Sequence, residues 1–476
     1  MKNLIIISAL ALSIALPGSA GAATLLEIYQ QALQMDPLIH EAEARRLAAL
    51  EAKPQARGAY LPQIDFTGSM GTTTRSGPVS FFTENERVTV DAEIETDSTA
   101  WSFNLRQTIF RWDQIVGLRR ADKLVAKAET DREAAQQDLI VRVVQRYFDV
   151  LAAEDRLLAR HSNKNAIARQ LEQAKQRFDV GLIAITDVQE SQAAFDSAVA
   201  DEIAAKRSLA TAREFLREIT GSYVSELSAP GPDLPLNNPD PTSEAAWIDL
   251  ALGQNLALVS SRIDERLARD EISFRRTGHY PSLELVANTR EQTDDQSVVT
   301  PLGSTSEDLT NPSDSISLQF SLPLFAGGTT SSRVREAVYL HRASRENLQR
   351  VTRETERQAR DAYLGVLSEI SRVNALERAV ESNQTALEAT EAGFEVGTRT
   401  IVDVLNAQFQ LFNAIVNYRQ SRYDYILNVM RLKQAAGNLA VQDLESLEPF
   451  LEDRKTPEQQ FADEEAAKAA EEAAAE

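Results

Sequence analysis

The chain has 476 residues, no cysteine, and 71 acidic against 50 basic residues, which gives a formal net charge of −21. The absence of cysteine excludes disulfides, thiolate metal sites and cysteine nucleophiles. The acidic balance and the lack of a basic tract argue against nucleic acid as a partner. The four histidines are scattered, and no Ser-His-Asp set or phosphate loop occurs, so we expect no catalytic residues, no metal site and no cofactor.

The N-terminus has the pattern of an export signal. Lys2 supplies a positive charge, the residues from Leu4 to Leu16 form an apolar run, and Ala20-Gly21-Ala22 fits the small-x-small cleavage pattern. The run is shorter than the ~20 residues that a membrane-spanning helix needs. The pattern therefore predicts a signal peptide at 1–22 and a mature chain that is periplasmic, secreted or inserted as a β-barrel.

Two copies of one pattern recur along the chain at a nearly constant spacing. The first copy reads Phe178-Asp179-Val180-Gly181-Leu182, and 216 residues later the second reads Phe394-Glu395-Val396-Gly397-Thr398. The same shift maps Gly221 onto Gly437, and nearer the N-terminus a shift of 219 maps Ala32 onto Ala251 and Pro62 onto Pro281. This self-similarity predicts a duplication, with repeats at 23–229 and 243–450 joined by a Pro-rich linker at 230–242.

Each half begins with a helical region, expected at 25–57 (interrupted near Pro37) and at 244–276. Segments of alternating apolar and polar residues follow, which predicts strands with one apolar and one polar face. They lie at 64–70 and 101–106 in the first copy and at 283–285 and 315–322 in the second. The polar stretches between them, 72–98 and 291–314, are expected to be long extracellular loops.

The polar face of these strands is rich in small hydroxyl residues, which favours a membrane barrel over a soluble sheet with one wet face. Four strands cannot close such a barrel, since the smallest has about eight strands, and an open edge in lipid leaves backbone groups unpaired. Other protomers should therefore complete the wall, and three protomers would supply about twelve strands.

Proline-free stretches at 113–177 and 329–393 predict two helices of roughly 96 Å each. Apolar residues recur every seven positions, which predicts coiled-coil packing, although an apolar stripe facing an ordinary core is the alternative. The second copy has Val366, Val373, Val380, Leu387 and Phe394 at these positions. The first copy has Val150, Leu157, Leu171 and Phe178, with Lys164 as the exception.

The tail at 451–476 is acidic and Ala-rich. We expect it to be disordered or loosely helical, and the sequence assigns it no function.

The segment 396–405, Val-Gly-Thr-Arg-Thr-Ile-Val-Asp-Val-Leu, resembles the TolC family of outer-membrane efflux and type I secretion channels. The first-copy stretch 178–189 and the junction 322–328 (Leu-Pro-Leu-Phe-Ala-Gly-Gly) fit the same family pattern. The resemblance covers the mature chain apart from its tail. It implies an α+β membrane protein, a homotrimer whose twelve-stranded transmembrane β-barrel sits in outer-membrane lipid and joins a long α-helical coiled-coil barrel in the periplasm. It also implies recruitment by a periplasmic adaptor and an inner-membrane transporter, for export of drugs or proteins.

Asp403 and Asn406 lie three residues apart, on one face of a helix. Repeated by threefold symmetry, Asp403 would form a ring of three carboxylates at the pore constriction, and such a ring selects cations. The family commonly carries a second acidic ring where this chain has Asn406. We therefore expect a weaker cation preference and a weaker block by multivalent cations.

The resemblance also implies a gate latch, meaning a bond between the two helical hairpins at the closed end. Arg399 matches the family's gate arginine, and Thr186 and Asp187 match its partners. The family's tyrosine is Phe394 here, so a hydroxyl hydrogen bond is missing and Arg399 should carry most of the latch. The turns expected to contact the adaptor are Val180-Gly181-Leu182 and Val396-Gly397-Thr398.

Two other classes of protein stay open on the residues alone. A soluble periplasmic adaptor or a structural coiled coil would account for the signal peptide and the heptads. Neither needs alternating strands at the helix ends in both copies. Detergent-dependent, heat-modifiable trimers would favour the channel over both.

Overall fold

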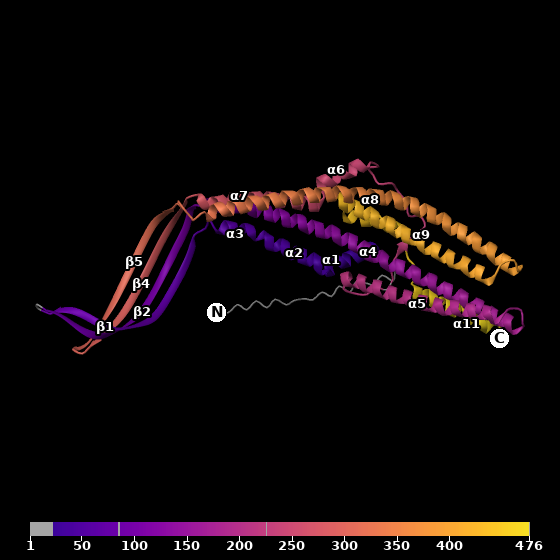
Figure 1. Ribbon diagram of the computed structural model, residues 1–476, viewed down its shortest axis with the longest axis horizontal. Helices are drawn as coiled ribbons and strands as arrows, with labels where there is room; N and C mark the ends of the chain where they lie inside the picture. Colours follow the sequence, from indigo (N-terminus) through magenta and orange to yellow (C-terminus); the bar gives the residue numbers. More distant parts are fainter. Residues whose placement is uncertain (1–21, 84–85, 225, 476) are drawn as a thin grey trace, which may run out of the picture. The chain divides into compact units, whose positions relative to one another are not determined.

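The computed structural model describes residues 22–83, 86–224 and 226–475 (Figure 1). The predicted signal peptide lies outside the described residues apart from Ala22. The helices are α1 (Leu25–Met35), α2 (Pro37–Leu50), α3 (Ala52–Gly58), α4 (Trp112–Asp179), α5 (Ile185–Thr220), α6 (Glu244–Gln254), α7 (Leu256–Arg276), α8 (Thr329–Glu395), α9 (Ile401–Ala436), α10 (Val441–Glu445) and α11 (Pro457–Ala475), with 3-10 turns η1 (Thr277–His279) and η2 (Glu448–Phe450). The strands are β1 (Gln63–Thr83), β2 (Glu86–Phe110), β3 (Ala229–Pro230), β4 (Ser282–Thr300), β5 (Gly303–Ser321) and β6 (Leu451–Glu452).

The chain forms two compact units. The helical unit comprises the described parts of 1–40, 134–255 and 355–476, and the strand unit comprises 41–133 and 256–354. Across the described residues, no helix is both long and apolar enough to cross a membrane. The same residues hold no group of three or more His, Cys, Asp or Glu side chains that could bind a metal ion.

The strand unit contains one antiparallel sheet in the order β1-β2-β4-β5, so the two copies meet where β2 pairs with β4 (Figure 1). The strands are longer than the sequence predicted. The stretches 72–98 and 291–314, expected to be loops, are the far halves of two strand hairpins, paired down to Thr83↔Glu86 and Thr300↔Gly303. That prediction was wrong because the stretch 71–77 has no apolar side chain and interrupts the hydrophobic period, while backbone pairing continues through it; the period resumes at Val88, Val90 and Ile94.

Near the helix-proximal end of the sheet, apolar and polar rows alternate in register across all four strands. One apolar row consists of Ile64, Leu105, Ala287 and Ile316. The adjacent polar row consists of Asp65, Asn104, Asn288 and Ser315. The apolar row is not covered by a core at its edges: Ile64 is 66% exposed and Ile316 is 81% exposed, while Leu105 and Ala287 on the central strands are half-buried.

The helical unit is held by an apolar core in which the predicted heptad positions are buried. Val150, Leu157, Val366 and Val373 are each at most 3% exposed. The exception, Lys164, has a structural reason, because its ammonium donates to the carboxylate of buried Glu202 (2.9 Å). A charged residue at a heptad position is tolerated when it is paired in this way.

The repeat recurs in the geometry of this unit. Helices α5 and α9 begin and end at positions 216 apart, and each ends at a glycine with positive φ, Gly221 or Gly437. Near the N-terminus, α1 and α6 begin and end 219 residues apart, and Ala32 and Ala251 are both fully buried. The chain as described is a mostly helical protein with one four-stranded sheet.

The acidic tail forms helix α11, and a helix was one of the two states expected of it. Phe461 packs against the core of the helical unit. The helix begins at Thr456, whose hydroxyl accepts from the backbone N–H of Gln459 (3.3 Å). The anchoring contacts join residues far apart in the sequence, and composition does not show them.

Candidate functional site at the tip of the helical unit

Two helical hairpins, α4–α5 and α8–α9, turn at one end of the helical unit. We call this end the tip, meaning the turns 180–184 and 396–400 and the helix ends that they join. The turns have the same geometry: Leu182 N–H donates to Arg177 O (2.9 Å), and Thr398 N–H donates to Gly393 O (2.8 Å). Gly181 and Gly397 have φ of 77° and 76°, a region that glycine enters without strain. The structure thus places both predicted turns as expected.

Asp403 lies in the first turn of α9, where its side chain is fixed by the helix start. Its carboxylate accepts from the backbone N–H and the hydroxyl of Thr400 (2.9 Å each), and Thr400 Oγ1 accepts from Asp403 N–H (3.2 Å). This capping box lowers the pKa of Asp403 below its ordinary value, and Arg399 lowers it further. The first copy has Ala184 in place of Thr400, so α5 has no side-chain cap.

Asn406 lies one turn further along α9 and is exposed. Between the two, Val404 is buried against Leu387 and Leu411. Packing on that side of α9 leaves Asn406 free on another face, while Asp403 is half-buried. The helix therefore presents a polar group at each of two successive levels.

The predicted latch residues are not joined within one chain. Arg399 is exposed, and its backbone N–H donates to Gly393 O (3.2 Å). Gly393 accommodates this residue, since a Cβ there would lie 2.8 Å from Arg399 Cγ. In the described part of the chain, Arg399 has no ion pair with Asp187 or hydrogen bond with Thr186. Thr186 is exposed and Asp187 is half-buried.

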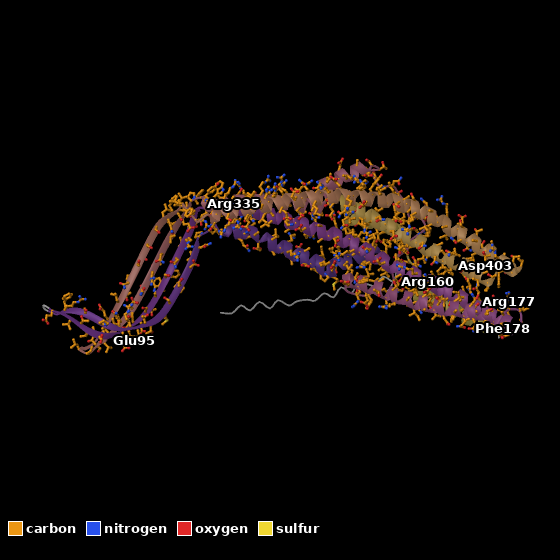
Figure 2. The ribbon with its side chains drawn as sticks, in the orientation of Figure 1. Glu95, Arg160, Arg177, Phe178, Arg335 and Asp403 are labelled. Atoms are coloured by element: carbon orange, nitrogen blue, oxygen red, sulfur yellow. The ribbon has the colours of Figure 1, made fainter. Side chains whose placement is uncertain are left out.

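A different arginine joins the hairpins at the tip. The guanidinium of Arg177, at the end of α4, lies over the ring of Phe394 with 4.8 Å between guanidinium carbon and ring centre. Higher up, Arg160 lies over the ring of Phe409 on α9 at 5.3 Å. Figure 2 labels Arg177, Phe178 and Asp403 at this end of the unit. Sequence reasoning missed both arginines, although the repeat offered one signal: the copy of Arg177 is Gly393.

Packing beside the Arg177–Phe394 contact is loose. A hollow of about 740 Å³ separates parts of the two hairpins, and its lining includes Ile167, Asp187, Phe394 and Phe409. The Oε1 of Gln170 is buried at its wall without a hydrogen-bond partner. Above the tip, the hairpins are fastened by Arg419, whose guanidinium binds buried Asp155 (2.6 Å). The tip is therefore the less constrained end of the hairpin contact.

Two repeated helical hairpins with a polar tip, together with a sheet that exposes an apolar face, are features of outer-membrane channel subunits. The comparisons agree. The family model described as outer membrane efflux protein matches residues 28–222 and 247–438. The chain is 38% identical to the outer membrane protein TolC of Vibrio cholerae, over 90% of this chain and 94% of that protein. It is 29% identical to the alkaline protease secretion protein AprF of Pseudomonas aeruginosa, over 91% and 88%.

Among solved structures, the Campylobacter jejuni CmeC outer membrane channel has the same fold, with a TM-score of 0.70 at 17% identity, covering 94% of this chain and 97% of that one. The chain belongs to the outer membrane efflux protein family. It is an outer-membrane exit duct, and its relatives are channels and secretion proteins rather than enzymes.

Proposed function

We propose that three copies of this chain form one duct, in which twelve strands close a transmembrane β-barrel and twelve helices form a periplasmic tunnel. The observation that carries the proposal is the sheet itself. In the chain as described, β1 and β5 each pair on one side only. Unpaired strand edges in lipid cost several kcal/mol per backbone group, so the edges need partners. Pairing β5 of one copy with β1 of the next satisfies both.

The exposed apolar rows support the same assembly, because an outward apolar band and an inward polar face are what a barrel in lipid requires. The repeats at 23–229 and 243–450 would then supply equivalent wall segments, and the Pro-rich segment 230–242 would cross between them. The mature chain would begin after the signal peptide at 1–22.

The tip would be the periplasmic gate. Three copies of Asp403 would form an acidic ring, each carboxylate bound by Thr400 of its own chain, and Asn406 would form an uncharged ring one turn away. Since Arg399 has no ion pair among the residues that the structure describes, it is available to bind Thr186 and Asp187 of a neighbouring copy. Opening would then require breaking that latch and separating Phe394 from Arg177.

The tips would contact a periplasmic adaptor, which an inner-membrane transporter would engage. Val180, Leu182 and Val396 are each more than 70% exposed, an apolar surface at the turns that a partner would cover. The names of the relatives suggest both efflux and protein secretion as uses of the duct. The alternative, a periplasmic adaptor or structural coiled coil, would leave the exposed apolar face of the sheet without a role.

The test is purification of the full chain from outer membranes. We expect a detergent-soluble complex with the mass of three chains, which dissociates only on heating in SDS. It should form cation-selective channels in planar bilayers. A monomer that remains soluble without detergent would contradict the proposal. The cargo is addressed separately, by testing a deletion strain for drug sensitivity and for loss of a secreted protein.

A further inference from the structure

Helix α11 has no role in the duct described above, yet it lies along the α4–α5 hairpin (Figure 1). The carboxylate of Glu458 binds Arg213 of α5 (2.8 Å). The ring of Phe461 stacks on His161 of α4, with 3.8 Å between ring centres. One turn further, Glu464 accepts from Asn165 Nδ2 (3.5 Å) and lies equally far from His161 Nε2.

These contacts fix the direction of α11. Arg213 bridges Glu458 and Glu154, so the start of α11 lies level with Glu154 on α4. Glu464 lies level with Asn165, further along α4. The helix therefore runs parallel to α4 toward the tip. From Asn165 to Leu182 the hairpin extends by about 26 Å, and α11 continues for about 17 Å beyond Glu464. It covers most of this flank of the hairpin.

The covered flank is chemically suited to an acidic helix. His161 Nδ1 lies 2.8 Å from Glu202, and Lys164 and Lys206 bind the same carboxylate at 2.9 and 3.2 Å. Arg213, His161 and Asn165 lie where they contact the carboxylates of Glu458 and Glu464. The face of α11 toward it presents a carboxylate, an aromatic ring and a carboxylate at intervals of three residues, which is one face of a helix. We call the surface formed by His161, Asn165 and Arg213 the α11 flank.

The start of α11 is buried at Thr456 and Pro457, and Gln459 Nε2 donates to Glu226 (2.6 Å), but the polar contacts are few and most involve partly exposed side chains. Glu458 and Glu464 are exposed, as is typical of ion pairs that water and salt weaken. Among the α11 residues with described side chains, only Phe461 makes an aromatic contact. A helix held in this way can be displaced by another helix with the same pattern.

We propose that the α11 flank is a docking surface for an acidic amphipathic helix, that α11 is its resident occupant, and that a helix of the periplasmic adaptor displaces α11 on the way to the tip. The docking of α11 stands on the contacts alone. The identity of the competitor rests on the proposed function.

The first experiment measures docking. A fluorescent peptide of residues 453–476 is titrated into a duct whose chains are truncated after Thr456. We expect saturable binding that falls at least fivefold when the peptide carries Glu458→Gln, Phe461→Ala or Glu464→Gln. The matched control is Asp463→Asn, the same charge change at a carboxylate that binds only Lys455 of the tail (2.7 Å). Absence of saturable binding, or an equal loss with the control peptide, would overturn docking.

The second experiment tests displacement in cells. Since the natural chain has no cysteine, Asn165→Cys and Glu464→Cys introduce a unique pair that a bis-maleimide can bridge. We expect the bridged duct to accumulate ethidium severalfold above the wild type, while each single variant treated with the same reagent behaves as the wild type. A bridged duct that exports normally would overturn displacement. If a strain with the unmodified chain exports neither ethidium nor a secreted protein, the proposed function fails, and the peptide titration still decides docking.

Discussion

The guanidinium of Arg177 lies 4.8 Å from the centre of the Phe394 ring, and this contact joins the two hairpins of one chain at the tip. A cation over a ring face at an exposed site contributes about 0.5–1 kcal/mol. Removing the cation with Arg177→Ala should raise the open population about two- to fivefold. The frequency of large-conductance openings in planar bilayers measures this.

Two further variants make that prediction specific. Phe394→Leu removes the ring and should match Arg177→Ala, whereas Phe394→Tyr keeps the ring face and should open no more often than the wild type. Arg169→Ala removes an equal charge from an exposed position on the same helix, and no change is expected. Unchanged gating in Arg177→Ala would mean that the contact does not restrain the tip.

Arg399→Ser tests the latch between copies. Since Arg399 is exposed and unpaired with Asp187 in its own chain, its loss should leave the fold of each chain intact. It should weaken the closed trimer, because a guanidinium fork can bind two acceptors and serine cannot. We expect a higher single-channel conductance with an unchanged melting temperature. A conductance equal to that of the wild type would remove Arg399 from the latch.

Asp403→Asn tests the acidic ring, and the pH dependence of cation selectivity in the wild type tests it a second time. The hydrogen bonds from Thr400, together with Arg399, lower the pKa of Asp403. In the wild type, cation selectivity should be lost as pH falls through the pKa of the Asp403 ring, which these bonds lower and the repulsion among three neighbouring carboxylates raises. Asp403→Asn should lack this selectivity at every pH. Glu395→Gln, the same charge change on an exposed residue of the tip, should retain it.

The parts of this molecule that could be predicted are those with a periodic or conformational signature. The seven-residue spacing located buried positions such as Val366, and the glycines at 181 and 397 marked turns that need positive φ. The long strands could not be bounded in the same way. From Gly71 to Gly77, β1 has no apolar side chain on either face, so the pairing of this stretch with β2 comes from backbone groups that every sequence has.

The contacts between distant helices could not be predicted from the sequence either. Arg177 has no local pattern that distinguishes it from other helix arginines, and its partner lies 217 residues away. The ordering of α11 depends on His161 and Arg213, which give no sign of a shared surface until the hairpin is folded. The family resemblance predicted roles for Arg399 and Asp403 at the tip, but it predicted no role for Arg177, the arginine that contacts Phe394.

Glu202 predicts how the helical unit responds to acid. Burial alone would raise its pKa, but hydrogen bonds from His161, Lys164 and Lys206 lower the pKa to about 2. Because the folded pKa lies below the unfolded value of about 4.3, the stabilisation is complete above that value and is lost as pH falls toward 2. Glu202→Gln should destabilise the unit by about 1–3 kcal/mol at pH 6, and the difference should vanish near pH 2.

Thermal melting across this pH range measures the effect. Glu190→Gln, an exposed carboxylate on the same helix, is the control and should match the wild type throughout. If Glu202→Gln lowers the stability of the unit by the same amount at every pH, the charge of the carboxylate does not stabilise the unit, and only the shape of the side chain contributes.

The exposed apolar row of the sheet gives the most direct test of membrane insertion. Ile316 is 81% exposed and lies in register with Leu105 and Ala287, whereas Ser317 is on the opposite face of the same strand. An arginine that faces lipid costs about 2–4 kcal/mol at the bilayer midplane and ~0–1 kcal/mol near the interface. Ile316→Arg should therefore reduce heat-stable trimer in the outer membrane severalfold. Ser317→Arg should assemble normally and change conductance instead, because its side chain would project into the lumen. If Ser317→Arg prevents assembly and Ile316→Arg does not, the polar face of the strand is the one that contacts lipid. If both variants assemble equally well, this part of the sheet does not contact lipid.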